Sequence, residues 1–433
     1  MATLLRSVPH HECAKSELLY DDPQFFQTDI LEDYTSYVST KNSVLDSNNP
    51  LVFDIENSVD FVDLSDTELK LTFQIHKANG DALATTDKMC PINNTLSSLF
   101  QSAQVSLKDQ IVSHSNSMYN YRSYIETLLS YGAAAKSGFL ECSGWISDEA
   151  GKFDQEANSA LDKRMKPFVN KKDVEMKSRL HIDLSFQEKI LPSNLDIRIV
   201  LTPAKPEFIF FSKTENAQFK LKITGATLYV RKVKLNPAKQ LAFEKTISKS
   251  PIRIPISYVS MRNLTVPANV ATYNNDGLYS GVLPHLVIIG IVDNSNFVGT
   301  IDKNPYNFAH HDLTSLLLRK NGKNVPTQAL TPNYAEDRYV DCYQTIFDAM
   351  GVKYDNFDNG ISYFQYKNGN CLYAFNLMPD NCSHNNSPVT GSLDLSIRFK
   401  NTLATSKSVI LYAMYDNNIF IDQHRNIITD ISA

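Results

Sequence analysis

The chain has 433 residues, of which 42% are hydrophobic and 21% charged, and its formal net charge is −5. This length allows two or three domains with a full hydrophobic core, and the composition excludes a small disulfide-stapled fold, a disordered chain and a fibrous one. Apolar runs stay shorter than the roughly 18 residues that a membrane helix needs, so no membrane span is expected.

The cysteines and the first residues indicate the compartment. Six cysteines lie at positions 13, 90, 142, 342, 371 and 382, with no CxxC pair among them. That spacing fits neither a zinc site nor a disulfide framework, so free thiols are expected. The first residues lack the apolar stretch and cleavage site of a secretory signal. We therefore expect maturation inside a cell and no secretion by the signal-peptide route.

Acidic residues are concentrated near the N-terminus. Residues 1–60 hold eleven Asp and Glu against three Lys and Arg, a balance of −8, which leaves +3 for the rest of the chain. Proteins that package nucleic acid through a terminal arm need the opposite sign there, because they neutralise phosphates. Direct, sequence-specific binding of nucleic acid is therefore not expected.

Strands are predicted along the whole chain by alternation of apolar and polar residues. In Leu69–Ile75 every second side chain is apolar, which is typical of a half-buried antiparallel strand. The apolar run Leu283–Val292 predicts a strand that is buried on both faces. The chain is thus expected to be mainly all-β, with further alternating strands over Leu180–Phe186, Leu195–Leu201, Phe219–Ile223 and Leu393–Phe399.

One helix is predicted between these strands. Tyr121, Tyr124, Ile125, Leu128 and Leu129 follow helical spacing, and Gly132 is placed to end the helix. We expect it to cover the end of a sheet. Two segments exceed hairpin length and are expected to project as loops with their own packing: residues 138–174 and 331–360.

A weak internal similarity suggests duplication. IDLSF at Ile182–Phe186, followed by the predicted strand Leu195–Leu201, resembles LDLSI at Leu393–Ile397, followed by a strand over Val409–Met414. The two segments are 211 residues apart, close to half the chain. Two similar β-domains of about 200 residues each would suit eight-stranded jelly rolls with inserted loops.

Recognisable catalytic chemistry is absent from the sequence. There is no phosphate-binding GxxxxGK[ST], no GxGxxG, no HExxH and no GxSxG, so we predict no enzyme, no catalytic or metal-binding residue and no cofactor. An enzyme on a β-sandwich would need a converging His/Asp pocket, which no spacing suggests. A carbohydrate- or receptor-binding jelly-roll module stays an alternative, with one candidate aromatic platform: Tyr354, Phe357, Tyr363 and Phe364.

Several ordered segments together resemble one family. They are KSELLYDDPQFFQTDI, DFVDLSDTELKLTFQI, YNYRSYIETLLSYG, the W-x-x-D-x-x-G of Trp145, Asp148 and Gly151, LYVRKVKLNP, FVGTIDKNPYNFAHHDL, the NG-x-x-x-P of Asn321–Pro326, and IFIDQHRNI. Together they span nearly the whole chain, from Lys15 to Ile427. The chain resembles the major capsid protein of Maverick/Polinton elements and the related adintoviruses. It departs where family members often have PPTQTSI and this chain has DDPQFFQTDI.

The resemblance implies a double jelly roll of the hexon-like type, with two tandem eight-stranded β-sandwich or barrel domains. It implies a structural protein of an icosahedral capsid around double-stranded DNA, in which a homotrimer forms a pseudo-hexameric capsomer. Expected partners are neighbouring capsomers and penton, minor capsid or cement proteins. The expected location is the virion, after assembly inside the host cell, in the nucleus.

We expect an N-terminal arm over residues 1–45, a first jelly roll over 46–235 and a second over 236–433. Interfaces rather than pockets are the expected sites, because large rings supply much of the contact energy at interfaces. Ordinary core packing is the alternative interpretation of the same side chains. The predicted anchors are Trp145 and Phe153 in the first long loop, and Asn304, Pro305, Tyr306, Asn307 and Phe308 in a turn before a strand.

The acidic arm supports one further hypothesis. Asp21, Asp22, Glu32 and Asp33 would attract a basic minor capsid or cement protein by complementary charge. Neutralising these four residues without any effect on assembly would refute the hypothesis.

Overall fold

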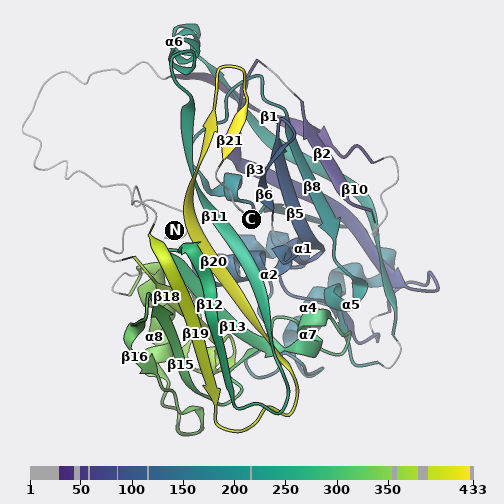
Figure 1. Ribbon diagram of the computed structural model, residues 1–433. Helices are drawn as coiled ribbons and strands as arrows, with labels where there is room; N and C mark the ends of the chain where they lie inside the picture. The colour runs from purple at the N-terminus through teal and green to yellow at the C-terminus, as the bar shows by residue number, and fades with distance from the viewer. Residues whose placement is uncertain are drawn as a thin grey trace, which may run out of the picture.

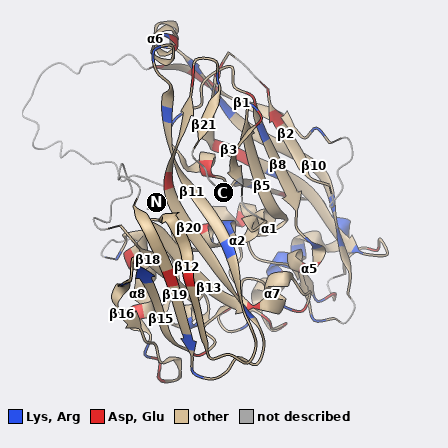
Figure 2. Cartoon of the chain, in the orientation of Figure 1, with Lys and Arg blue, Asp and Glu red and all other residues tan. Residues whose placement is uncertain are grey.

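A computed structural model describes residues 29–42, 49–56, 59–84, 86–114, 117–214, 217–353, 358–378 and 389–429. Two barrels form the molecule, one from each half of the chain (Figure 1). Asp21, Asp22, Tyr354 and Phe357 lie outside the described residues. Figure 2 shows Lys and Arg interspersed with Asp and Glu on both barrels.

The first barrel consists of two antiparallel four-stranded sheets and a short two-stranded sheet. One sheet contains β1 (Ile30–Ser39), β10 (Phe219–Leu235), β3 (Phe61–Lys77) and β7 (Val174–Arg179), in that order. The second contains β2 (Leu51–Ile55), β8 (Ile197–Pro203), β5 (Phe100–Leu107) and β6 (Gln110–His114). The short sheet pairs β4 (Met89–Pro91) with β9 (Phe210–Ser212).

The second barrel repeats this plan. One sheet contains β11 (Ile252–Val266), β20 (Lys407–Ile421), β13 (Leu286–Asp293) and β18 (Leu372–Asn376), with β21 (Ile427–Thr429) paired to β20. The other contains β12 (Thr272–Val282), β19 (Thr390–Phe399), β15 (Leu313–Lys320) and β16 (Lys323–Leu330). A short pair joins β14 (Phe308–Ala309) to β17 (Asn368–Gly369).

The strand order is identical in the two barrels. When the eight main strands of each barrel are numbered along the chain, the sheets run 1-8-3-6 and 2-7-4-5 in both. Two facing four-stranded sheets with Greek-key connections form a jelly roll. The all-β double jelly roll is therefore confirmed. In both barrels the longest insertion lies between the fifth and the sixth strand.

The similarity that suggested duplication paired the wrong strands. Residues 182–186 are not a strand; they form the 3-10 turn η4 (Asp183–Phe186), because the Asp183 carboxylate is drawn into the interior by Arg122. The segment LDLSI lies in β19, the seventh strand of its barrel, whose counterpart is β8. The duplication is therefore visible in the strand order, while the particular match of IDLSF with LDLSI is wrong.

The predicted helix exists as α2 (Tyr119–Ser130), but Gly132 does not end it. Tyr131 already has extended backbone, and Gly132 instead precedes α3 (Ala133–Lys136). The remaining short helices are α1 (Thr95–Ser98), η2 (Phe139–Ser143), α4 (Ser159–Met165), η3 (Lys166–Lys171), α5 (Pro206–Ile209), α6 (Pro237–Ile247), α7 (Asn294–Val298), η5 (Tyr334–Glu336), α8 (Val340–Met350) and α9 (Tyr363–Lys367).

The segment expected as an arm includes β1. This strand pairs with β10 along most of its length, so residues 30–39 are part of the first sheet. Glu32 forms an ion pair with Lys234 at 2.8 Å, and Asp33 forms one with Arg231 at 3.0 Å. These two carboxylates therefore already have cationic partners within the barrel.

Candidate functional site

The candidate site is the junction between the two barrels, which is built around α2. All twelve residues of α2 are buried, and they include the charged Arg122 and Glu126. Burial of a charge is unfavourable unless the group is paired and hydrogen-bonded. The partners come from both barrels, so α2 connects the barrels in addition to covering the first one.

A buried ionic network holds α2 in place. The Arg122 guanidinium contacts Glu126 at 2.9 Å and Asp183 at 2.8 Å, and His181 Nδ1 lies 2.6 Å from the other Glu126 oxygen. From β20 of the second barrel, the Tyr412 hydroxyl donates to Glu126 at 3.1 Å. Burial opposes ionisation of Glu126, but Arg122 and His181 outweigh it, so the pKa of this carboxyl lies below its usual value.

Asp183 is the second link between the barrels. Its carboxylate accepts hydrogen bonds from the Ser113 hydroxyl at 2.7 Å and from the backbone N–H of Val259, in β11, at 3.2 Å. Burial raises the pKa of Asp183, although the Arg122 charge and these donors act in the opposite direction. A rotation of one barrel against the other would break contacts to both Glu126 and Asp183.

A polar cluster in the first insertion makes a third link. Asp148 forms a buried ion pair with Arg164, whose Nη1 lies 3.2 Å from one carboxylate oxygen. The same carboxylate accepts from the Asn158 amide at 3.0 Å and from the Asn304 amide at 3.1 Å. Asn304 belongs to the loop between β13 and β15, so Asp148 joins the insertion of the first barrel to the second barrel.

Asp154, in the insertion of the first barrel, makes further contacts to the β13–β15 loop. Its carboxylate accepts from the backbone N–H of Asn304 at 2.6 Å and from the Asn307 amide at 2.8 Å. Asn304 also accepts, through its side-chain oxygen, from the backbone N–H of Tyr306 at 3.0 Å. These contacts fix the turn that presents Tyr306 to α2.

Aromatic rings fill the space between the ionic network and this cluster. The Tyr124 ring, on α2, stacks on Tyr306 with centroids 3.9 Å apart and planes 10° apart. Its other neighbour is Trp145, at 5.3 Å and 28°. Tyr121 meets Tyr306 edge to face at 5.6 Å, and its hydroxyl donates to the Pro305 carbonyl at 3.1 Å. Stacked and edge-to-face rings stabilise beyond their buried area.

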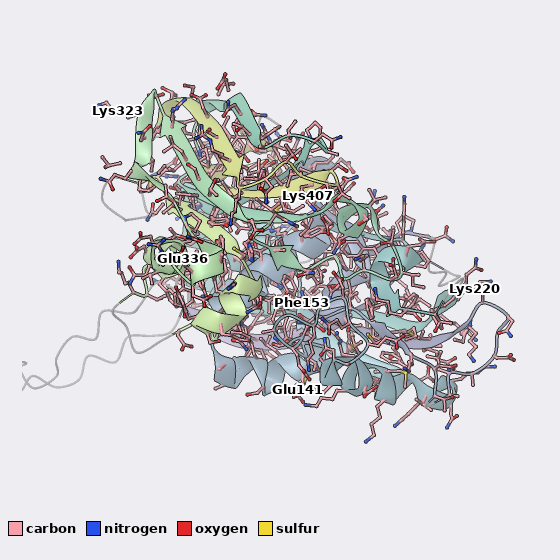
Figure 3. All side chains as sticks on the ribbon, turned by 90° about the horizontal axis from the view of Figure 1, so that it is seen from below. Glu141, Phe153, Lys220, Lys323, Glu336 and Lys407 are labelled. Carbon is pink, nitrogen blue, oxygen red and sulfur yellow. The ribbon has the colours of Figure 1, made fainter. Side chains whose placement is uncertain are left out.

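Two glycines allow the rings to fit. A Cβ on Gly369 would lie 2.2 Å from the Phe153 ring, and a Cβ on Gly290 would lie 2.5 Å from the Phe308 ring. Figure 3 shows Phe153 near the centre of the molecule, away from the labelled Lys220 and Lys323 at its margins. Phe153 therefore packs against the second barrel although it belongs to the insertion of the first.

The structure brings the sequence-predicted anchors together within one chain. Six of the seven are fully buried, Asn307 is half-buried, and together they form the contact between the first insertion and the β13–β15 loop: Trp145, Phe153, Asn304, Pro305, Tyr306, Asn307 and Phe308. Asp148 and Gly151 of the W-x-x-D-x-x-G motif lie in the same contact, where the Gly151 N–H donates to the Asn368 carbonyl at 2.9 Å.

Sequence reasoning missed the ionic network. Arg122, Glu126, His181 and Asp183 were not singled out, because charged residues on a predicted helix usually face solvent. The available signal was Arg122 and Glu126 at i and i+4 inside a helix whose other residues are largely aromatic or aliphatic. In the described ranges, no group of three or more His, Cys, Asp or Glu side chains is placed to hold a metal ion.

Sequence comparison with known proteins finds one relative that matches over almost the full length. No family model matches the chain. The uncharacterized protein F54H12.2 of Caenorhabditis elegans is 23% identical over 423 residues, covering 93% of this chain and 98% of that protein.

Solved structures match across almost the full length. A chain of the Sputnik virophage structure matches with a TM-score of 0.64 and 11% identity, covering 99% of this chain and 94% of that one. PBCV-1 VP54 matches at 0.60 with 11% identity, covering 94% and 98%. The mavirus major capsid protein matches at 0.55 with 9% identity, covering 99% and 96%. The chain therefore has the same double jelly-roll fold as these proteins.

Proposed function

We propose that the chain is the major capsid protein of a double-stranded DNA virus or virus-like element, and that three copies form a pseudo-hexameric capsomer. The observation that carries the proposal is the repeated strand order in two barrels whose relative position is set by a buried junction. Three such chains in a closed ring present six similar barrels around one axis. That outline tiles an icosahedral shell.

The likeness to chains from Sputnik, PBCV-1 and mavirus supports this function, since the mavirus protein is named as a major capsid protein. The sequence resemblance to Maverick/Polinton and adintovirus proteins favours a major capsid protein of these elements and viruses in particular. Neighbouring capsomers, a penton protein and minor capsid or cement proteins are the corresponding partners. The corresponding location is the virion, following assembly in the host nucleus and without the secretory route.

The role is structural rather than catalytic. Over the described residues, no helix is long and apolar enough to cross a membrane. We place the first jelly roll before and the second after residue 236, because β10 ends at Leu235 and α6 begins at Pro237. The two long segments, residues 138–174 and 331–360, would form the outer tower of the capsomer.

The carbohydrate-binding alternative has little support in the described part of its aromatic platform. Tyr363 stacks on Tyr339 at 4.1 Å and donates to the Asp337 carbonyl at 2.8 Å, so its ring is used in packing. Phe364 is exposed. A single exposed ring does not make a sugar platform.

The test is the solution mass of the purified chain by light scattering, followed by negative-stain imaging of the same peak. A particle of three times 48.8 kDa with a hexagonal outline supports the capsomer. A monomer at every concentration would overturn unaided trimerisation, and binding on a glycan array would then favour the alternative.

A further inference from the structure

A row of exposed lysines lies on the outer face of the sheet that contains β10. Lys220, Lys222 and Thr224 are exposed and alternate with buried apolar residues, so they point away from the core. Lys222 precedes the end of β10 at Leu235 by 13 residues, or about 40 Å of strand. Since α6 follows Leu235, these lysines lie at the end of the barrel opposite to α6 (Figure 1). Figure 3 shows Lys220 at the margin of the molecule.

The end of the first insertion brings two more lysines to this row. The Thr224 hydroxyl donates to the Asp173 carboxylate at 2.9 Å. Lys171 and Lys172 come directly before Asp173 and are exposed. Segments that are distant in sequence therefore meet here, and we call four of their residues the lysine row: Lys171, Lys172, Lys220 and Lys222.

Two carboxylates on the neighbouring strands and turns are neutralised by lysines outside the row. Glu175, two residues after Asp173, pairs with Lys70 of β3 at 2.9 Å. Asp87 pairs at 3.0 Å with Lys77, the last residue of β3. These two pairs cancel, so they leave the charge of the lysine row unchanged.

The remaining charge is positive. In the described ranges, no lysine of the row forms an ion pair, and neither does Lys166, which is exposed at the start of η3. The carboxylates that have no cationic partner in these segments are Asp173 and, in the turn after β3, Asp81. Asp162 and Lys163 of α4 balance each other. Five ammonium groups therefore oppose two carboxylates.

The spacing of the lysine row suits a linear polyanion. Successive side chains on one face of a strand are about 7 Å apart, so Lys220 and Lys222 lie in line along β10. Thr224 and Asp173 connect this line to Lys171 and Lys172. Like charges that are held together concentrate anions at a surface. A polymer with repeated anionic groups contacts several lysines at once, which a single phosphate ion does not.

Two observations favour a sulfated polysaccharide over a nucleic acid as the occupant. Proteins that bind single strands stack the bases on aromatic rings, and none of the rings in β3, β7, β10 and η3 is exposed. In the proposed capsid the segment 138–174 forms the outer tower, and Lys171 and Lys172 belong to it. The lysine row then faces away from the genome, an orientation that rests on the proposed function.

We propose that the lysine row binds a linear sulfated polysaccharide of the heparin class, through which an assembled shell attaches to a cell surface. The ammonium groups of Lys220 and Lys222 donate hydrogen bonds to sulfate oxygens, and Lys171 and Lys172 extend the contact along the polymer. The contact lies within one chain, so only its outward direction depends on the capsid function.

Isothermal titration calorimetry of the full-length chain with a short heparin oligosaccharide tests the proposal. Binding should weaken as salt is added, because counterions are released when lysines neutralise the oligosaccharide. Lys220→Gln with Lys222→Gln should lower the affinity at least about fivefold and reduce the slope of log K against log[salt] by about 1. Both lysines are exposed, so the change leaves the core intact.

Lys245→Gln with Lys249→Gln is the matched control. These lysines are exposed at the end of α6 and just after it, so the control removes the same charge at the opposite end of the barrel. It should keep the affinity and the salt dependence of the unmodified chain. An oligosaccharide without sulfates should not bind, because the ammonium groups then have no anionic acceptors.

Four results would overturn the proposal. The first is no binding of the heparin oligosaccharide to the unmodified chain. The second is an equal loss of affinity in the two double variants, which would show that net charge alone drives binding. The third is full binding of the desulfated oligosaccharide. The fourth is equal competition by duplex DNA of the same charge, which would make the lysine row a nucleic-acid site.

The oligosaccharide is short enough to reach a single lysine row, so the measurement does not depend on trimer formation. A monomer that binds it would support this inference and refute the capsomer. A trimer that does not bind it would refute this inference alone.

Discussion

The equivalent central strands of the two barrels have opposite surroundings. In β3, the third strand of the first barrel, buried residues alternate with half-exposed ones from Leu69 to Ile75. In β13, the third strand of the second barrel, every residue from Leu286 to Val292 is buried. The same contrast holds between β10 and the first half of β20, where every residue from Lys407 to Met414 is buried.

The difference follows from what covers the outer face. The sheet of the first barrel has one face on its core and one face open, so its sequence alternates. The corresponding sheet of the second barrel is covered by the junction: Tyr412 of β20 reaches Glu126, and Phe308 packs on Gly290 of β13. The same strand order therefore forms a sheet with one solvent-facing side in the first barrel and a sheet covered on both sides in the second.

The largest effect is expected at the ionic network of the junction. Arg122→Met would leave Glu126 and Asp183 buried without their cation and should lower the free energy of unfolding by about 3–5 kcal/mol. Lys234→Met, which breaks an exposed pair on β10, is the control and should lower it by less than about 1 kcal/mol. Urea unfolding measures both. Equal losses of unfolding free energy in the two variants would show that the buried ionic network stabilises the chain no more than the exposed ion pair does.

A smaller effect is expected from a single methyl group on the covered sheet. Gly290→Ala places a Cβ 2.5 Å from the Phe308 ring, and this overpacking should cost about 1–3 kcal/mol. Gly225→Ala, on β10 of the first barrel, meets Thr72 at an ordinary 3.5 Å and should be close to neutral. Thermal unfolding of the two variants compares the packing of the covered sheet with that of the solvent-facing sheet. An unchanged melting temperature for Gly290→Ala would mean that the Phe308 ring can move aside.

The third comparison removes one hydroxyl from each eighth strand. Tyr412→Phe deletes the donor to Glu126 and should lower the free energy of unfolding by about 1–2 kcal/mol, because a buried charged acceptor loses a partner. Tyr229→Phe, at a half-exposed position of β10, should change it by less than about 0.5 kcal/mol. Similar values in urea unfolding would argue against a special role for the contact between barrels.

The strands were largely predictable from the sequence. Alternation of apolar and polar residues indicates a strand with one buried face, and a continuous apolar run indicates a strand with both faces buried. On those grounds strands are predicted over Leu69–Ile75 and Leu283–Val292; β3 confirms the first, and β13 confirms the second from Leu286 onward. Leu180–Phe186 shows the limit of the argument. Its alternation is real, but Asp183 between the apolar residues is also buried, and its bonds to Arg122 and Val259 turn the chain.

The junction was predictable only in part. Trp145, Tyr306 and Phe308 are large rings beside turn residues, and such rings need a partner wherever they lie. The ionic network was not predictable. Only the Arg122–Glu126 pair is local in sequence, at i and i+4, whereas Glu126 and His181 are 55 residues apart and Arg122 and Asp183 are 61 residues apart. A single sequence does not indicate which charged residues form ion pairs when they are this far apart along the chain.

The smallest effect concerns the contact between the two insertions, where the barrels meet again. Lys136 donates from Nζ to the Leu128 carbonyl of the first insertion and to the Asn359 carbonyl of the second, both at 2.6 Å. Burial lowers its pKa to about 7. Between this value and about 10.4 the unfolded chain binds the additional proton, so this lysine makes stability rise with pH.

Lys136→Met should therefore flatten the rise in the free energy of unfolding between pH 7 and 9, measured by urea titration at each pH. Lys367→Met is the matched control in the second insertion, where the ammonium pairs with Asp337 at 2.6 Å near the surface. That variant should keep the slope of the unmodified chain. An unchanged slope in Lys136→Met would mean that the ammonium stays charged between its two carbonyls, so that the insertions are joined equally firmly at neutral and alkaline pH.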